Sequence, residues 1–222
     1  MSDNWDLAIQ YAPYIYFDSK EPFMPVRIAV TLLKPGDASP SFNRTFQWDG
    51  EPLQAIIEYA IYWDYDIQHL YELEHVWIYV GQDGRVLDCE ASFHGAYHNG
   101  MLEDRGNIED ETHVRLYSQP GKHAFRPSAA DFERLPDLVS CASTDAGKQG
   151  LIITDILRGR MASTPEIDGM VERYLRTHAF IPSMKFERYK MDPRIFVRWE
   201  SLWEEIPLRI QDRLRELQEA FA

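Results

Sequence analysis

The side chains that could do chemistry gather in one quarter of the chain. Six of the seven histidines lie in that quarter: His69, His75, His94, His98, His113 and His123. Acidic residues are interleaved with them, namely Asp64, Asp66, Glu72, Glu74 and Glu90. Imidazole and carboxylate groups mixed in this way are what a metal site or an acid–base pair requires. The sequence therefore predicts a functional site built from this region.

The densest part of this region predicts a divalent metal site. Glu72 and Glu74 are two residues apart, so both side chains share one face if they lie in a strand. A preceding loop with Asp64, Asp66 and His69 could fold back above them. Carboxylates this close raise one another's pKa values unless a cation compensates, which makes a divalent ion the simplest occupant. Oxygen ligands favour Mg²⁺, Ca²⁺ or Mn²⁺, and histidine shifts the preference toward Zn²⁺. A solvated acidic loop without metal is the alternative.

Two further histidines are candidates for proton transfer. His94 ends a predicted strand in which Glu90 and Ser92 share its face, and the expected register places His75 diagonally opposite. His123 lies in a Pro-Gly turn that follows another predicted strand. If the protein is an enzyme, we expect His94 and His123 to act as general acid or base. The local signatures of phosphate-binding loops, serine hydrolases, helical zinc proteases and Rossmann enzymes are absent from the sequence.

Short aromatic and β-branched segments predict the sheet that positions these residues. They cover residues 14–17, 26–33, 55–63, 74–80, 85–93 and 113–118. The clearest pair is a hairpin, because Asp83-Gly84 supplies the positive φ angles of a tight turn. With these two as loop residues, the expected cross-strand pairs are Val80 with Leu87, Tyr79 with Asp88, Ile78 with Cys89, Trp77 with Glu90, and Val76 with Ala91.

The pattern changes near residues 143–150, where small, polar and turn-forming residues gather. We place a boundary there, between residues 1–145 and a helical C-terminal extension, residues 146–222. Thr164 and Pro165 predict the start of an amphipathic helix that continues to about Leu175. A second apolar stripe runs from Leu202 to Phe221, with Pro207 expected to kink or restart the helix. These helices are expected to pack on the sheet, with a homodimer interface as the alternative.

Taken in order, the motifs resemble a known family. Residues 11–17 and 21–25 are similar to the opening of the vacuolar-protein-sorting-like β-sandwich proteins, residues 72–77 to their Asp-Trp-Glu-His-Val strand, residues 92–95 to their Ser-x-His-Gly motif, and residues 121–124 to their Gly-Ser-His-Ala turn. More distant relatives are the necrosis- and ethylene-inducing-like proteins, whose Gly-His-Arg-His-Asp-Trp-Glu motif holds a divalent cation. His69, Glu72 and Glu74 reproduce the spacing of that motif.

The resemblance implies a fold and a ligand set. Over residues 8 to 130 it implies a β-sandwich with a divalent-cation site, in which Asp64 or Asp66 stands for an upstream aspartate ligand. The expected fold is therefore mainly β, an antiparallel β-sandwich over residues 1–145 with the C-terminal helices packed on it.

The composition restricts the classes of partner that the protein is expected to bind. The chain has 222 residues, with 36 acidic residues against 23 lysines and arginines, and its net charge of -13 repels nucleic acid and anionic membranes. Cys89 and Cys141 form no metal-binding CxxC pair and allow at most one disulfide. We find no leader pattern and no apolar run of the roughly 18 residues that span a bilayer, so a soluble cytoplasmic protein is the default expectation.

Three functions stay open at this point. The protein could be a metal-dependent hydrolase, a non-catalytic module that binds a glycan, a lipid head group or another small ligand, or a structural homodimer. An enzyme predicts a concave pocket with an open metal position. A binding module predicts exposed aromatic side chains such as Tyr65, Tyr71 or Tyr97, and a scaffold predicts a large apolar interface.

Overall fold

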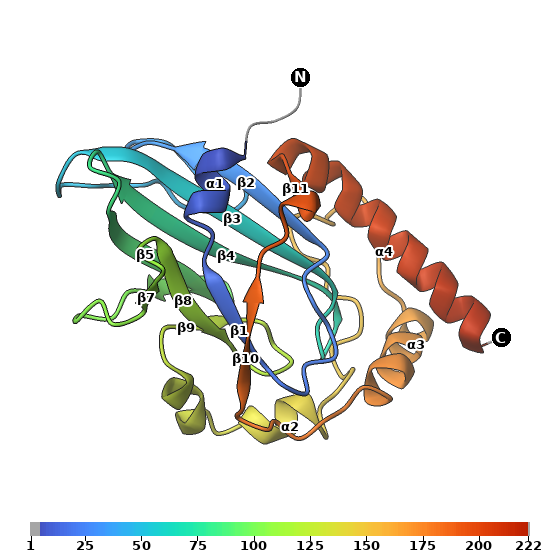
Figure 1. The fold of residues 1–222 in the computed structure, drawn as a ribbon. Coiled ribbons are helices and arrows are strands. Elements are labelled where there is room, and N and C mark those ends of the chain that lie inside the picture. Colours follow the sequence, from blue (N-terminus) through green and yellow to red (C-terminus); the bar gives the residue numbers. More distant parts are fainter. Residues whose placement is uncertain (1–4, 222) are drawn as a thin grey trace.

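The computed structural model describes residues 5–221 (Figure 1). The larger of its two sheets has six strands. Their order is β11-β2-β3-β4-β5-β6. Neighbouring strands are antiparallel, except that β11 runs parallel to β2. The strands are β2 (Arg27–Leu33), β3 (Leu53–Tyr65), β4 (Leu70–Gly81), β5 (Val86–Phe93), β6 (Ala96–Asn99) and β11 (Phe196–Val197).

A second, smaller sheet has the order β10-β1-β8-β7, and β9 also pairs with β8. In this sheet β1 and β8 are parallel, and the other pairs are antiparallel. The strands are β1 (Tyr14–Asp18), β7 (Ile108–Glu109), β8 (His113–Ser118), β9 (Phe125–Arg126) and β10 (Phe186–Lys190).

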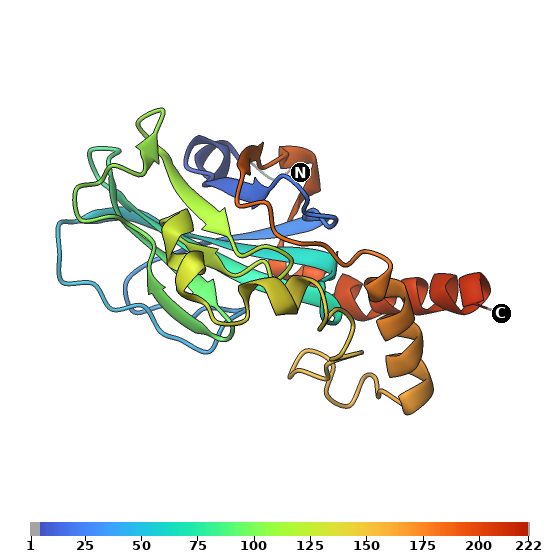
Figure 2. The ribbon, with the colours of Figure 1, turned by 90° about the horizontal axis from the view of Figure 1, so that it is seen from below.

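One buried cluster joins the two sheets into a sandwich. Ile15 and Phe17 of β1 and Leu116 of β8 belong to the same apolar core as Ile57 and Tyr59 of β3. Figures 1 and 2 show helices α3 and α4 together at one side of the sheets. The prediction of a mainly β, sandwich-like fold with C-terminal helices is therefore confirmed.

The strands predicted from the sequence are present as β1, β2, β3, β4, β5 and β8. In the hairpin, the predicted pairs from Val76 with Ala91 to Tyr79 with Asp88 are correct. The pair predicted next to the turn is wrong, because Val80 pairs with Val86 instead of Leu87. A bulge after Tyr79 shifts the ladder by one residue.

Strand β3 is buried on both faces, and residues 55–64 are all buried. Its inner face packs in the main core. Its outer face is covered first by the loop of residues 34–52, whose Phe46 joins Ile56 in a second small core, and then by α4. A strand covered on both faces needs no polar alternation, which explains the nearly continuous apolar run in this part of the sequence.

The carboxylate of Glu58 ties the 34–52 loop to the sheet. Glu58 lies on the outer face of β3 and is 1% exposed. It accepts hydrogen bonds from Trp77 Nε1 at 2.7 Å, from Ser41 Oγ at 2.7 Å, and from the Ser39 hydroxyl. Both serines belong to the loop, so this side chain helps to hold the loop over the sheet.

Helix α3 (Pro165–Arg176) begins as predicted, with the Thr164 hydroxyl accepting the Ile167 amide at 3.3 Å. Helix α4 (Trp199–Phe221) begins three residues before the predicted stripe and continues through Pro207. Proline leaves the carbonyl four residues earlier without its helical donor. That carbonyl, on Trp203, accepts Arg160 Nη1 at 3.1 Å instead. The shorter helices are α1 (Asp6–Gln10), α2 (Leu138–Ala142), and two 3₁₀ turns, Ala129–Arg134 and Pro193–Ile195.

Two strands come from the part of the chain in which we expected helices only. Strand β10 pairs with β1, and β11 pairs with β2, so residues after 146 contribute to both sheets. The division of the chain at residues 145 and 146 stays a prediction, as does a homodimer through the helices. Cys89 and Cys141 are both free and buried. Within residues 5–221, no helix combines the length and the apolar character that crossing a membrane demands.

We expect the substitution Glu58→Ala to destabilise the protein by about 2–4 kcal/mol, because it leaves the buried Trp77 Nε1 donor and two partly buried serine hydroxyls without their shared acceptor. Urea unfolding of the purified variant measures this change. Glu51→Ala is the matched control, since Glu51 has a side chain that is 66% exposed and forms only a surface ion pair with Arg85. The control should change stability by less than about 0.5 kcal/mol. Equal stability of both variants would contradict the assigned role of Glu58.

Candidate metal centre

A short loop between β3 and β4 carries the first candidate ligands. Within it, the Asp66 amide bonds the His69 carbonyl at 3.0 Å, and the Gln68 amide bonds Asp66 Oδ1 at 2.8 Å. Neighbouring segments hold the loop from two sides. The Ile67 amide donates to the Gly121 carbonyl, and the Gly147 amide donates to the Ile67 carbonyl, both at 2.9 Å. The loop is therefore fixed by segments far away in sequence.

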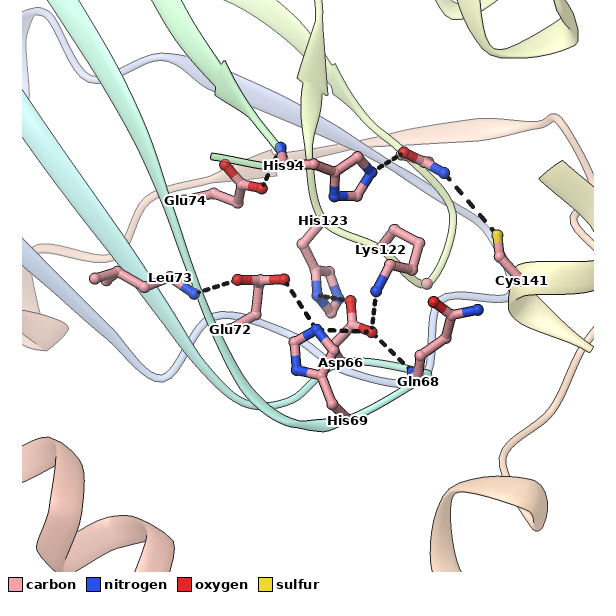
Figure 3. A network of polar contacts seen from close by, with 12 residues as sticks. Asp66, Gln68, His69, Glu72, Leu73, Glu74, His94, Lys122, His123 and Cys141 are labelled. Atoms are coloured by element: carbon pink, nitrogen blue, oxygen red, sulfur yellow. Dashed lines mark hydrogen bonds and ion pairs between the residues drawn. The ribbon is translucent and has the colours of Figure 1, made fainter. Parts of the chain in front are cut away.

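Asp66, His69 and Glu72 converge on one point (Figure 3). One potential ligand atom from each residue lies within 4.8 Å of the others. The His69 Nε2 atom is 3.6 Å from Asp66 Oδ1 and 3.5 Å from Glu72 Oε2. Asp66 is completely buried, while the Glu72 side chain is 17% exposed. The predicted loop does fold back over the start of β4, and it brings three of the five predicted ligands together.

Glu74 lies next to this group, and its pKa is shifted in the opposite direction from that of Glu72. Burial and then the charge of Glu72 raise the pKa of Glu74 to about 8. Burial also disfavours the charged form of Glu72, but the close contact with His69, the charge of His69 and the charge of Lys122 lower its pKa to about 2. Glu74 accepts hydrogen bonds from the Ser92 hydroxyl and, at 3.3 Å, from the His94 amide. The two glutamates share the face that their spacing predicted.

Lys122 brings a buried cation to the group. Its Nζ atom donates to Asp66 Oδ1 at 2.7 Å, and the side chain is 8% exposed. Burial works against the charged ammonium, yet the charges of Asp66 and Glu72 outweigh burial and raise the pKa of Lys122. His69 lies near the same carboxylates: burial lowers its pKa, but Asp66 and Glu72 raise it above the ordinary histidine value.

His123 lies behind the group and is fully buried. Its ring stacks on Trp63, with a centroid distance of 4.6 Å. The Nε2 atom is 3.3 Å from Glu21 Oε1, and the Nδ1 atom is 3.7 Å from Asp66 Oδ2. His123 is not among the residues that line the cleft described below. This position suits a residue that orients Asp66 better than one that meets a substrate.

His94 faces the cleft and stands beside Glu74. Its φ angle of 52° ends β5, so the expected diagonal arrangement with His75 is wrong. The His94 Nε2 atom is 2.9 Å from Gln119 Oε1, which leaves Nδ1 for other partners. His75 lies on the other face of β4, where its Nε2 is 3.0 Å from Ser41 Oγ and its ring stacks on Trp77. The end of the β4–β5 ladder at Val76 and Ala91 and the left-handed backbone at His94 therefore separate the two histidines.

The structure does not bring Asp64 into the group. Asp64 forms a bidentate ion pair with Arg209 of α4, with both N–O distances at 2.8 Å. Two other histidines of the region also have separate contacts. His98 Nε2 is 2.8 Å from the Phe125 carbonyl, and His113 stacks on Tyr14.

His69 and Glu72 line a cleft of about 600 Å³, and the buried Asp66 lies beside them without lining it. A second hollow of about 430 Å³ adjoins it and shares Glu72 as a lining residue. Sequence analysis did not identify Lys122, Gln119 or Phe42 as site residues, although Lys122 directly precedes a candidate histidine. The cleft is lined by Phe42, Gln68, His69, Tyr71, Glu72, Leu73, Glu74, His94, Gly95, Lys122, Asp137, Gln149, Ile152 and Thr154.

Comparisons with known proteins give little further information. No protein-family model and no curated protein matches the chain. Among solved structures, the chain is similar to the crystal structure of a triply substituted NLPPya, a necrosis- and ethylene-inducing-like protein. The match has 15% identity and a TM-score of 0.34, and it covers 58% of this chain and 77% of that chain. A likeness this distant carries no argument about the site, and the resemblance to the vacuolar-protein-sorting-like proteins stays a prediction.

Proposed function

We propose that Asp66, His69 and Glu72 bind a divalent metal ion at the floor of the cleft. The supporting observation is the spacing around His69 Nε2. Its distances of 3.5 and 3.6 Å to the two carboxylates are long for hydrogen bonds. Two ligand atoms on one tetrahedral ion, each about 2.1 Å from it, are about 3.4 Å apart. His69 is thus spaced from each of the two carboxylates as two ligands of one ion are.

Within residues 5–221, three of the seven non-glycine residues with positive φ angles lie around this cleft. Tyr71, His94 and His123 have φ angles of 58°, 52° and 61°, in the left-handed region that non-glycine residues seldom adopt. Such conformations persist where the surrounding structure enforces them, and they cluster at functional sites. All three border the candidate ligands or the cleft, which supports a functional role for this end of the sandwich.

The arrangement favours a hydrolytic metal site with an open position over a closed structural metal site. Catalytic metal sites use three protein ligands and keep one position open, and here two of the three candidates, His69 and Glu72, line the cleft. A divalent ion, when bound, supplies Lewis acidity and lowers the pKa of water. His94 lines the same cleft, and its contact with Gln119 orients the ring so that Nδ1 can exchange a proton with a substrate. We therefore assign His94 the general acid–base role and His123 the positioning of Asp66.

A non-catalytic ligand-binding module is less well supported. Of the three tyrosines expected to be exposed in such a module, Tyr71 is 4% exposed and its hydroxyl contacts Thr154 Oγ1 at 2.7 Å. Tyr65 is half-buried, and only Tyr97 is exposed, at 45%. The cleft therefore offers no exposed aromatic platform of the predicted kind from Tyr65 or Tyr71.

We expect the untagged protein, purified without chelator and then titrated with Mn²⁺ or Zn²⁺, to bind close to one equivalent of metal. His69→Ala and Glu72→Gln should each weaken binding by at least about 100-fold, since even the loss of an outer-shell partner costs 10–100-fold. Isothermal titration calorimetry and elemental analysis measure both quantities.

His98→Ala is the control for this experiment, because His98 contacts backbone carbonyls outside the three-residue group. This variant should bind metal like the wild type. If no divalent ion binds to the wild-type protein, or if binding survives both ligand substitutions, the proposed site is wrong.

The hydrolase assignment makes a separate prediction. A panel of nitrophenyl esters, phosphodiesters and glycosides should contain a substrate that the metal-loaded protein cleaves. The substitution His94→Gln should lower kcat by about 10²–10⁴-fold, the usual contribution of a general acid or base, while the bound metal is retained. Metal binding without turnover of any substrate class would instead favour the non-catalytic module.

A further inference from the structure

The cleft contains one ammonium group among several carboxylates. Of the described residues that line it, Glu72, Glu74 and Asp137 are acidic, and Lys122 is the single lysine or arginine. The Lys122 side chain is 8% exposed, so it is far less solvated than a surface lysine. An ammonium is placed in such surroundings at a substantial desolvation cost unless a carboxylate compensates.

The Lys122 ammonium contacts the oxygen of Asp66 that faces His69. The Oδ1 atom of Asp66, which is the oxygen next to His69 Nε2, already accepts the Lys122 ammonium at 2.7 Å and the Gln68 amide at 2.8 Å. The Oδ2 atom points to the other side, toward His123 at 3.7 Å. A metal ion shared by Asp66 and His69 therefore needs the oxygen that Lys122 holds.

The turn that carries Lys122 is fixed by its neighbours. Gly121 has a φ angle of 74°, and a Cβ atom there would lie 2.7 Å from a methyl carbon of Ile67. The Gly121 amide donates to Glu21 Oε2 at 2.7 Å, and the Lys122 amide donates to the Gln119 carbonyl at 3.0 Å. The position of the ammonium is thus built into the fold, on the opposite side of the site from β4.

We propose that the Lys122 ammonium is an internal counter-cation that a divalent ion must displace from Asp66. This inference rests on the proposed metal-binding function and adds a control of affinity to it. In the metal-free state Lys122 neutralises part of the carboxylate charge. When a divalent ion binds, the lysine leaves Asp66 and extends into the cleft, which its side chain already lines. The free energy of metal binding then contains the difference between two interactions with Asp66, that of the metal ion and that of the Lys122 ammonium.

The alternative role for Lys122 has the opposite consequence. If Lys122 only holds Asp66 in the orientation that the metal needs, it acts as an outer-shell support. Removing the ammonium would then loosen Asp66 and weaken metal binding. The sign of the change in affinity therefore separates competition from support.

The first test compares Mn²⁺ binding to the wild type, to Lys122→Met and to Lys148→Met by calorimetry. Lys122→Met should bind Mn²⁺ more tightly by at least about tenfold, because a unit positive charge within a few ångströms no longer opposes the ion. Lys148→Met should bind like the wild type, since Lys148 pairs with Asp145 and its side chain is 51% exposed. Unchanged or weaker binding in Lys122→Met would overturn the proposal. If neither the wild type nor Lys122→Met binds Mn²⁺, the proposed metal site itself fails.

A second test uses the wild type and so does not depend on a variant that folds. Acetylation with acetic anhydride, followed by peptide mass spectrometry, measures how accessible each lysine amine is. Saturating Mn²⁺ should increase the modification of Lys122, since its amine leaves Asp66 for the cleft, while modification of exposed Lys148 stays constant. Metal binding that leaves the reactivity of Lys122 unchanged would overturn displacement without affecting the proposed metal site.

Discussion

The candidate site depends on the compensation of charge at Asp66, a carboxylate with no exposure to solvent. Burying such a group is costly unless hydrogen bonds and an opposite charge replace water. The Gln68 amide and the Lys122 ammonium supply both. Each comes from a segment whose backbone is itself held in place, so the β3–β4 loop and the 119–124 turn stabilise each other through this carboxylate. The geometry of His69 and Glu72 follows, because His69 Nε2 lies beside Asp66 Oδ1 and in turn contacts Glu72 Oε2.

The sandwich explains why these groups meet at one end of the molecule. Strand β3 is covered on its outer face by the 34–52 loop and by α4, so its polar groups are used for attachment: Glu58 anchors the loop, and Asp64 anchors α4. Only beyond the end of β3 is the chain free to turn carboxylates toward a cleft. The loop anchored by Glu58 also contributes Phe42 to the wall of that cleft. The outer layer thus provides both stability and one side of the site.

Much of this arrangement could be predicted from local sequence, and the reason for each success or failure is physical. A period of two places Glu72 and Glu74 on one face wherever they form a strand, so their proximity was predictable. Asp64 and Asp66 have the same spacing, but the choice between them depends on Arg209, which lies 145 residues from Asp64 in the sequence. The separation of His94 from His75 depends on where the β4–β5 ladder ends and on a left-handed backbone angle at His94. Strand β10 was missed because its exposed residues show little apolar pattern.

The part of the chain after residue 146 is a component of the site, whatever its autonomy as a folding unit. The Gln149 amide donates to the Gln68 carbonyl, and the Leu70 amide donates to the Gly150 carbonyl, each at 2.9 Å, so this segment clamps the ligand loop. Thr154 then bonds the Tyr71 hydroxyl, one residue before Glu72, and lines the cleft. Because backbone hydrogen bonds from this segment hold both ends of the 66–70 loop, the first 145 residues alone lack part of the contacts that fix His69 between its two carboxylates. The spacing that supports a metal ion is therefore a property of the whole chain.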